Sequence, residues 1–282
     1  MNISRRRFIQ TSVAVPALAG LGTTSSSFAA AQTAEHNKPK FTLGVASYTF
    51  RNFDRAKTIE MTRRAGFEKI CFKDMHLKMT ATNEECASAA EECAKAGLAL
   101  YACGVVNMRN AEDVDNAFRY AKAASMETIV AVPQPAVLPQ VEEKVKETGI
   151  YIAIHNHGPG DRLYPTPEVI MENIHTLDKR IGICIDVGHT ARIGADVVKS
   201  IIDYKDRIHD VHFKDETEAT PQGQTCICGR GVLNLYSYLM ALIEIGYDRV
   251  VSFEYEADQR DPLPGLMESA GYVRGMLAAI SR

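Results

Sequence analysis

The chain has 282 residues, with 32 lysine and arginine residues against 35 aspartate and glutamate residues, and a formal net charge of −3. The first 31 residues contain Arg5, Arg6 and Arg7 but no acidic residue, so the remainder has a formal charge of −6. A mildly acidic chain argues against a nucleic-acid partner, because proteins that bind nucleic acids present a basic face. About 250 residues suffice for one large α/β domain with an ample core.

Residues 1–31 have the pattern of an export signal. The segment "SRRRFIQ" (4–10) places arginines before the short apolar stretch "TSVAVPALAGLG", and the small residues of "SSSFAAAQ" suit cleavage near residues 29–31. The apolar stretch is about a dozen residues long, too short to span a bilayer as an anchor helix. We predict a twin-arginine signal peptide over 1–31, a linker over 32–40, and a mature protein that is periplasmic or otherwise exported and not membrane-bound.

From residue 41 onward, short apolar runs alternate with longer amphipathic stretches, without a linker-like break. We predict strands over 41–48, 68–73, 98–106, 127–133, 150–155, 181–186, 208–214 and 249–256. We predict helices over 54–65, 83–96, 111–124, 137–148, 166–178, 195–205, 234–245 and 265–281. Eight strand–helix units indicate a single (β/α)8 TIM barrel of the α/β class over residues 41–282. An open doubly wound sheet usually has a Gly-rich phosphate turn after its first strand, whereas this first strand ends in "SYTFR".

Polar residues gather at one end of the predicted strands. Charged and imidazole groups within core strands are costly to bury without partners, so their positions carry information. In a TIM barrel, the carboxyl ends of the strands and the loops beyond them build the active site. The polar residues at these positions are Lys73, Asp74, His76, His155, His157, Asp186, His189, Asp210, His212, Lys214, Glu254 and Glu256.

Four of these residues form a candidate metal site. Because side chains alternate along a strand, one ligand at the end of each of four consecutive strands can point into the barrel mouth. Two neutral imidazoles and two carboxylates suit a single divalent ion, Mn²⁺, Zn²⁺, Co²⁺ or Fe²⁺, and leave positions open for a chelating substrate. We predict that His155, Asp186, His212 and Glu254 bind this ion.

Each ligand also has a structural alternative. A lone His212 is compatible with a hydrogen-bonded core histidine, and Asp186 with a cap on the following helix. His155 precedes "NHGPG" and is placed to hydrogen-bond that turn. Because four such coincidences at the same end of consecutive strands are improbable, the pattern favours a joint metal site.

Four segments resemble the xylose-isomerase-like TIM barrel superfamily, and the resemblance extends over roughly residues 41–280. They are "CIDVGH" (184–189), "VHFKD" (211–215), "GRGVLNL" (229–235) and "VSFEYE" (251–256). The superfamily includes sugar-phosphate isomerases and epimerases, tagatose- and psicose-type 3-epimerases, inosose dehydratases and the endonuclease IV type of DNA-repair enzyme. The resemblance implies a divalent metal on Glu, Asp, His and Glu at the ends of strands five to eight. Asp186, His212 and Glu254 match the last three, and His155 replaces the first glutamate.

This replacement changes the expected chemistry. The related 3-epimerases resemble two-base enzymes, with one metal-bound glutamate on each face of the substrate. His155 removes one of these carboxylates, which favours a single-base reaction that removes a proton beside a metal-polarised carbonyl. The resemblance then implies that Glu254, or the neighbouring Glu256, is the base. Lys214 would neutralise the developing oxyanion or donate a proton, and His157 would take part in proton transfer or contact substrate.

The remaining predicted residues contact substrate. His189 follows Asp186 in the motif, and Glu256 follows Glu254 on the same side of its strand. Arg230 lies in a Gly-x-Gly loop near the usual phosphate-binding region of a barrel, where backbone N–H groups face an anion. The full set predicted to bind substrate is His189, Arg230, Glu256, Lys73 and His76.

Together these features predict an exported, divalent-metal-dependent isomerase or epimerase that acts on a small sugar or keto-sugar through an enediolate. Export argues against a phosphorylated substrate, since phosphorylated sugars are mostly cytoplasmic. One alternative is a lyase or dehydratase that eliminates a β-substituent, for example from a 3-keto-glycoside or an inosose-like substrate. Another is a non-catalytic sugar-binding barrel with a structural metal. A DNA-repair nuclease disagrees with the acidic mature chain.

The seven cysteines are odd in number and do not have the spacing of a disulfide scaffold. Several lie within predicted apolar strands, where cysteine behaves as a small hydrophobic residue. Because the twin-arginine route exports proteins already folded in a reducing cytoplasm, we expect buried free thiols. Cys226 and Cys228, in a Gly-rich loop, are the pair for which redox or metal chemistry is considered.

Overall fold

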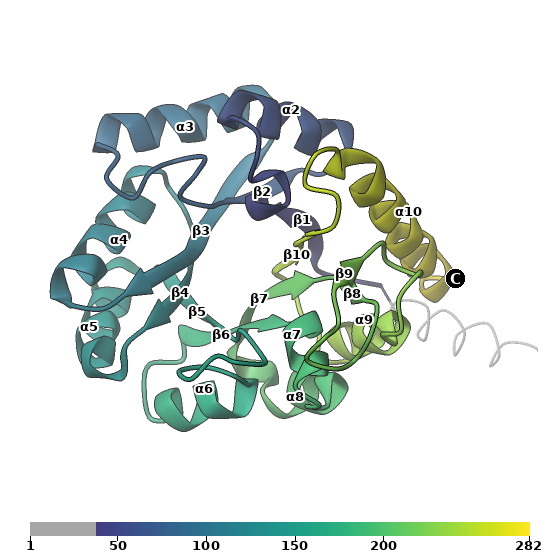
Figure 1. Cartoon of the computed structure of the whole chain (residues 1–282). Coiled ribbons are helices and arrows are strands. Elements are labelled where there is room, and N and C mark those ends of the chain that lie inside the picture. The colour runs from purple at the N-terminus through teal and green to yellow at the C-terminus, as the bar shows by residue number, and fades with distance from the viewer. Residues whose placement is uncertain (1–37) are drawn as a thin grey trace, which may run out of the picture.

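Eight parallel strands close into a barrel, in the order β1-β10-β7-β6-β5-β4-β3-β2 around the wall (Figure 1). The computed structural model describes residues 38–282, so the predicted signal peptide and most of the linker lie outside the described residues. The strands confirm the predicted (β/α)8 TIM barrel. They are β1 (Thr42–Ala46), β2 (Lys69–Phe72), β3 (Ala99–Met108), β4 (Thr128–Pro133), β5 (Tyr151–His155), β6 (Ile181–Asp186), β7 (Ile208–Phe213) and β10 (Val250–Phe253).

Helices surround the barrel and connect its strands (Figure 1). They are α2 (Arg55–Arg64), α3 (Asn83–Lys95), α4 (Ala111–Ala123), α5 (Leu138–Thr148), α6 (Pro167–Ile174), α7 (Val187–Arg192), α8 (Val197–Asp203), α9 (Leu235–Glu244) and α10 (Pro262–Ile280). Short 3-10 turns lie at η1 (Ser47–Phe50), η2 (Pro135–Val137) and η3 (Lys205–Arg207). A small antiparallel hairpin of β8 (Asp215–Glu216) and β9 (Thr225–Cys226) follows β7.

Two helix bounds differ from the prediction by three residues or more, for local reasons. Helix α6 ends at Ile174 rather than at residue 178, because the chain turns back at Asp178, whose carbonyl accepts a hydrogen bond from the first residue of β6. Helix α10 begins three residues earlier than predicted, at Pro262, since proline is well tolerated in the first turn of a helix. The hairpin β8-β9 and helix α7 were not predicted, because each is too short to produce a periodic pattern.

Local sequence determines where the helices start and stop. At the start of α3, Thr82 and Glu85 form a reciprocal capping box that satisfies two backbone N–H groups. Helix α5 ends at Gly149, which adopts a left-handed conformation that glycine tolerates best. At the start of α7, Asp186 Oδ1 accepts a hydrogen bond of 2.8 Å from the backbone N–H of His189. These caps place the carboxyl ends of the strands and the loops beyond them.

The core has two layers. A main apolar cluster lies between the strands and the surrounding helices, as the burial of Phe67, Ile129 and Leu242 illustrates. A smaller cluster fills the inside of the barrel, and it consists of Cys71, Tyr101, Ala102, Val130, Ala153, Cys184 and Val250. All seven cysteines lie within the described residues as free thiols, and only Cys226 is partly exposed. The expectation of buried free thiols is therefore confirmed.

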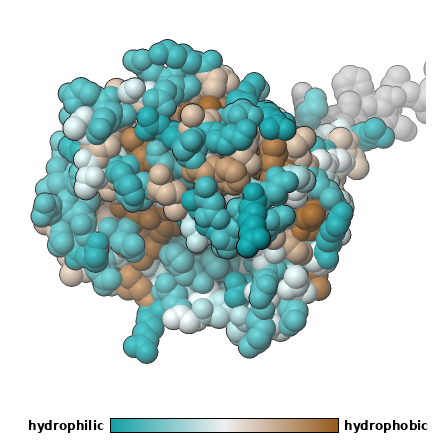
Figure 2. Space-filling model, turned by 45° about the horizontal axis from the view of Figure 1, so that its top comes forward, coloured by the Kyte–Doolittle hydropathy of each residue, from teal (hydrophilic) through white to brown (hydrophobic). Residues whose placement is uncertain are grey.

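The outer surface is mainly hydrophilic, and on the face seen in Figure 2 its apolar residues gather in small separate patches. Within residues 38–282, none of the helices combines the length and the apolar character required to cross a lipid bilayer.

Candidate functional site

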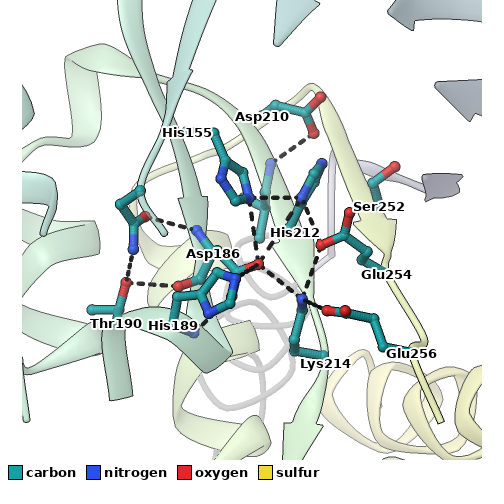
Figure 3. A network of polar contacts seen from close by, with 12 residues as sticks. His155, Asp186, His189, Thr190, Asp210, His212, Lys214, Ser252, Glu254 and Glu256 are labelled. Atoms are coloured by element: carbon teal, nitrogen blue, oxygen red, sulfur yellow. Dashed lines mark hydrogen bonds and ion pairs between the residues drawn. The ribbon is translucent and has the colours of Figure 1, made fainter. Parts of the chain in front are cut away.

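Four side chains converge from four neighbouring strands at the carboxyl end of the barrel (Figure 3). They are the side chains that the sequence analysis selected as metal ligands. One nitrogen or oxygen atom from each lies within 4.8 Å of one from every other, and all four residues are buried. The strand register explains the convergence, because the Cα of Asp186 on β6 pairs with that of His212 on β7. The remaining two members are His155 and Glu254.

The distances within this cluster match the spacing of ligands around one ion. His212 Nδ1 lies 3.0 Å from His155 Nε2 and 3.3 Å from Glu254 Oε2. His155 Nε2 lies 3.5 Å and His212 Nδ1 lies 4.0 Å from Asp186 Oδ2, and all four ligand atoms lie within 4.8 Å of one another. Atoms bound about 2.1 Å from one ion at tetrahedral or octahedral angles are about 3.0–3.4 Å apart. The four residues therefore fit a single divalent metal.

A buried carboxylate oxygen supports the same assignment. Asp186 Oδ2 accepts no hydrogen bond within the described residues, and nitrogens that approach it include Lys214 Nζ at 3.1 Å and His155 Nε2 at 3.5 Å. A buried polar atom without a partner costs about 1–3 kcal/mol, and more when it is charged. The structural alternative for Asp186 is also correct, because Oδ1 caps helix α7 while Oδ2 faces the cluster. One carboxylate thus fulfils both roles.

Lys214 brings a buried ammonium group to the cluster. Its Nζ lies 3.1 Å from Asp186 Oδ2, 2.9 Å from Glu254 Oε2 and 2.6 Å from Glu256 Oε1. Burial alone would lower the pKa of Lys214, but these three carboxylates raise the pKa well above its usual value. The side chain therefore keeps its proton. This favours charge neutralisation over proton donation, the two roles that the sequence left open.

The carboxylates of the cluster remain ionised. Burial alone would raise the pKa of Glu254, but Lys214, Lys73 and His212 lower it well below its usual value. Burial opposes ionisation of Asp186 as well, and His189, Lys214 and His155 likewise bring its pKa well below the usual range. Three carboxylates, Asp186, Glu254 and Glu256, face the two ammonium groups of Lys214 and Lys73, so acidic groups outnumber basic lysines here. That charge balance favours a cation.

Lys73 reaches the cluster from β2, which only β1 separates from β10. It follows β2, and its Nζ lies 3.1 Å from Glu254 Oε1, the oxygen that Lys214 does not contact. The same ammonium lies 5.2 Å from the centre of the Tyr48 ring, within range of a cation–π contact. Sequence analysis placed Lys73 near the substrate but did not foresee this ion pair, because it joins strands that are far apart in the chain.

Two further imidazoles stand beside the cluster. The ring of His157 lies 4.4 Å from that of His155, and His189 lies 5.9 Å from it at a right angle. Burial lowers the pKa of both outer histidines, so each is neutral at pH 7. His157 retains an exposed side-chain fraction of 36% and lies 3.5 Å from Asp161, whereas His189 is more deeply buried. Both rings are therefore placed beside the ligands, as the sequence predicted.

Two of the predicted substrate residues have other partners in the structure. Arg230 makes a two-pronged ion pair with Glu268 on α10, at the exposed edge of the Gly-x-Gly loop. His76 is buried, and its two ring nitrogens face Ser47 Oγ at 2.8 Å and the carbonyl of Phe50 at 3.2 Å. Neither side chain is brought into the metal cluster, and substrate contact by either residue stays a prediction.

Several contacts that hold the site were not predicted from the sequence. Asn156 donates to Thr190 Oγ1 and accepts from the backbone N–H of Asp186, so it links strand β5 to the start of α7. Below the cluster, Tyr101 Oη lies 2.9 Å from both Asp210 Oδ2 and Ser252 Oγ. Burial raises the pKa of Asp210 to about 6. The polarity of Asp210 on an apolar strand was the available signal, but its partner Tyr101 comes from β3, and Tyr101 in turn contacts Ser252 on β10.

Asp215 explains the Gly-x-Gly motif. Its carboxylate accepts hydrogen bonds from the backbone N–H groups of Gly229, Gly231 and Leu233, at distances of 2.9 to 3.1 Å. A Cβ atom on Gly231 would lie 2.3 Å from Asp215 Oδ1, so a side chain there is sterically excluded. The motif thus secures the loop after the hairpin β8-β9, and its N–H groups are occupied by a carboxylate of the chain itself.

A cavity of about 460 Å³ opens at the other end of the barrel. Its lining includes Tyr101, Tyr151, His209 and Arg249, and none of the predicted catalytic or metal-binding residues. Arg249 stacks on the Tyr151 ring at 3.6 Å, so its charge is already engaged. In barrels of this kind the chemistry resides at the carboxyl ends of the strands, and the metal cluster lies there.

The family comparison agrees with this geometry. The family model described as "Xylose isomerase-like TIM barrel" matches residues 59–276. The chain belongs to this family. The assignment confirms the resemblance inferred from the strand-end motifs, and it covers the strands that carry the metal cluster.

Individual relatives are distant. An inosose dehydratase of Lacticaseibacillus casei is 25% identical over 136 residues, which are 43% of this chain and 45% of the relative. The chain therefore spans about half the length of the curated relatives it matches. Among solved structures, an L-ribulose 3-epimerase has a TM-score of 0.70 at 17% identity and covers 85% of this chain and 95% of its own. A probable 3-DHS dehydratase of Bacillus anthracis has a TM-score of 0.68 at 14% identity, with 83% and 98% covered. At sequence identities of 17% and 14%, these structural similarities show a shared fold and nothing finer.

Proposed function

We propose that the protein is an exported, divalent-metal-dependent isomerase or epimerase of a small sugar or keto-sugar. The observation that carries the proposal is the convergence of two imidazoles and two carboxylates at the carboxyl end of the barrel. Support comes from the family and from the fold that the chain shares with an L-ribulose 3-epimerase. Hydroxyl and carbonyl oxygens of a sugar are the ligands that complete such a coordination sphere.

His155, Asp186, His212 and Glu254 would hold the ion. When bound, it would act as a Lewis acid that polarises the substrate carbonyl and stabilises an enediolate by several kcal/mol. We assign Mn²⁺, Zn²⁺, Co²⁺ or Fe²⁺ to this position because imidazole and carboxylate ligands are shared among these ions.

The protein residues would move one proton. A carboxylate, Glu254 or Glu256, takes a proton from the carbon beside the carbonyl and, in an isomerisation, returns it to the neighbouring carbon. An epimerisation would also need a proton donor on the opposite face, the role for which His157 is the candidate, while the base passes its proton to solvent. Lys214 already neutralises this pair and would compensate charge on the substrate oxygen. The neutral imidazoles of His157 and His189 are placed to donate hydrogen bonds to hydroxyl groups. Lys73 lies on the other side of Glu254 and would contact substrate there.

A second candidate function is supported by a specific observation. His155 stands where the family resemblance implies a glutamate, so the site lacks the second metal-bound carboxylate of a two-base epimerase. A single base suits β-elimination, in which the electron pair of the broken C–H bond expels a β-oxygen that an imidazole protonates. The substrate of such a lyase or dehydratase would be a 3-keto-glycoside or an inosose-like ketone, and an inosose dehydratase is among the relatives.

Export narrows the substrate class. If residues 1–31 are removed during twin-arginine transport, the enzyme would work in the periplasm or outside the cell, on unphosphorylated sugars. The partner is then a neutral or oxidised small sugar, without a nucleic-acid or membrane partner.

One experiment separates the two reactions. The mature protein, residues 32–282, is loaded with each divalent metal in turn and incubated in D₂O with aldoses, ketoses and 3-keto-glycosides, and NMR follows the products. Isomerisation or epimerisation yields a new sugar with deuterium at one carbon, whereas elimination yields an enone or a released aglycone. Sugar binding without turnover of any substrate would instead identify a non-catalytic sugar-binding barrel.

Two variants then identify the base. Glu254→Gln should lose both bound metal and turnover, because Glu254 is a ligand. Glu256→Gln should keep the metal, and its turnover should fall about 10²–10⁴-fold if Glu256 is the general base. Glu244→Gln, on the exposed end of α9, is the matched control and should change neither quantity. Full activity of Glu254→Gln with metal bound would contradict the proposal.

A further inference from the structure

A thiol lies beneath the two histidines of the metal cluster. Cys184 precedes Asp186 by two residues on β6, so both side chains point into the barrel and Cys184 lies about 6.6 Å further from the mouth. Its Cα pairs in register with that of His155 on the neighbouring strand β5. The residue is fully buried and its thiol is free.

This thiol belongs to a second group of potential ligands. Cys184 Sγ and one ring nitrogen each of His155 and His212 lie within 4.8 Å of one another. In addition, His155 Nδ1 and His212 Nε2 are buried without a hydrogen-bond partner. Nitrogen and sulfur ligands of tetrahedral zinc are about 3.6 Å apart, so an adjustment of about an ångström would complete a three-ligand set.

We infer that His155, Cys184 and His212 form a second, deeper cation position for a thiophilic ion such as Zn²⁺ or Co²⁺. The position shares both histidines with the carboxylate cluster above it, so only one of the two positions is filled at a time. Its existence does not depend on the sugar chemistry proposed above. The protein would then offer a divalent ion two ligand sets, one of nitrogen and sulfur within the barrel and one of nitrogen and oxygen at the mouth.

The two positions suit different ions. Thiolate and imidazole ligands select Zn²⁺ and Co²⁺, whereas carboxylates and substrate oxygens suit Mn²⁺. Binding at the deeper position breaks the S–H bond of Cys184 and forms a sulfur–metal bond, and the proton passes to solvent. Asp210, whose Cα pairs with that of Cys184 on the other side, provides an acidic group in the same layer. A zinc ion held there would withdraw both histidines from the mouth.

X-ray absorption at the zinc edge tests this assignment directly. The mature protein is treated with a chelator and reconstituted with one equivalent of Zn²⁺, and bound metal is measured. The deeper position predicts one sulfur neighbour at about 2.3 Å together with nitrogen or oxygen neighbours at about 2.0–2.1 Å. A parallel sample loaded with Mn²⁺ should show oxygen and nitrogen neighbours only.

Two cysteine variants assign the sulfur. Cys184→Ser should lose the sulfur neighbour, and Cys71→Ser should keep it. Cys71 is the matched control because it is equally buried in the same internal cluster but lies outside the ligand group. If Cys184→Ser does not fold, the wild-type spectrum still decides the question, and Cys184→Ala offers a second variant.

These experiments distinguish failure of the deeper cation position from failure of the proposed function. Bound zinc with only nitrogen and oxygen neighbours in the wild type would overturn the deeper position and leave the proposed mouth centre intact. A sulfur neighbour that persists in Cys184→Ser would also overturn it, by assigning the ligand to another cysteine. No bound metal of either kind would remove both positions, while the D₂O assay tests the sugar chemistry separately.

Discussion

Lys214 Nζ lies 2.9 Å from Glu254 Oε2, with both side chains buried at the barrel mouth. A buried charge is tolerated only when it is paired, and Lys214 contacts three carboxylates at once. This ion pair keeps Glu254 ionised, the form in which a carboxylate can bind a metal or accept a proton. It also means that, when no metal is bound, Asp186 has Lys214 as its ammonium partner, whereas Glu254 pairs with Lys73 as well.

The first prediction concerns Lys214→Met. Without the Lys214 ammonium, Asp186 loses its lysine partner in a buried site and Glu254 keeps only Lys73, so the metal-free protein should be destabilised by about 3–5 kcal/mol. Added Mn²⁺ or Zn²⁺ should restore more stability to the variant than to the wild type, because the ion replaces the missing positive charge. Urea unfolding with a chelator and with added metal measures both effects.

Lys146→Met provides the control for this experiment, since Lys146 makes only an exposed pair with Glu142 and should change stability by less than about 1 kcal/mol. Equal stability of Lys214→Met and wild type in chelator would show that the buried carboxylates do not need Lys214.

The second prediction concerns the pH dependence of stability through His209. Burial lowers the pKa of His209 from 6.5 to about 4, so the folded protein keeps this ring neutral where the unfolded chain takes up a proton. Below pH 6.5, protonation of His209 in the unfolded chain therefore favours unfolding. At about pH 4 this effect has lowered the free energy of unfolding by on the order of 3 kcal/mol. The effect is absent well above pH 6.5.

His209→Gln should lose this share of the pH dependence. Its unfolding free energy should fall less steeply between pH 6.5 and 4 than that of the wild type, whatever its stability at neutral pH. Urea unfolding in chelator across this range measures the two slopes, and the other buried histidines contribute equally to both proteins. Parallel slopes would show that His209 titrates normally in the folded state.

The third prediction concerns the loop held by Asp215. Asp215→Ala leaves three backbone N–H groups without their acceptor, so stability should fall by roughly 2–4 kcal/mol and residues 226–234 should become sensitive to protease. Asp215→Asn retains one oxygen acceptor and should show an intermediate loss. Urea unfolding and limited proteolysis give the two readouts. Glu218→Ala, on the exposed part of the same hairpin, serves as the control; a loop equally resistant in Asp215→Ala would contradict the role.

The fourth prediction concerns export. Replacing Arg5 and Arg6 together by lysine should retain the full-length protein in the cytoplasm, because the twin-arginine route requires the arginine pair. Cell fractionation and the mass of the processed protein measure the outcome. The matched control is Lys38→Arg, which lies beyond the predicted cleavage site and should be exported normally. Export of the double variant at the wild-type level would exclude this route.

Much of the fold could be predicted because its signals are local. Apolar runs and amphipathic stretches follow each other in regular order, and each predicted strand overlaps a strand of the barrel. The convergence of His155, Asp186, His212 and Glu254 could be predicted because a barrel places all carboxyl strand ends at one rim. Short elements such as helix α7 were not predicted, since six residues do not establish a helical period of hydrophobicity.

The partners of the site residues required the tertiary structure. Arg230 illustrates the difference: its loop suggested an anion site, but Glu268 on α10 pairs with its guanidinium and Asp215 takes the loop N–H groups. The ion pair of Lys73 with Glu254 joins residues separated by most of the barrel sequence. Such contacts depend on side-chain directions and on register, which local periodicity does not specify.

By itself, the sequence determined the barrel, the rim at which its polar residues collect and the identity of the residues that fit a metal. These follow from hydrophobic periodicity and from strand polarity, which are properties of short segments. Only the tertiary structure decided that Lys214 contacts three carboxylates, that Asp186 both caps a helix and faces the cluster, and that Cys184 lies beneath the histidines. The reason is that these relationships depend on how neighbouring strands are staggered, and the stagger is set when the whole barrel closes.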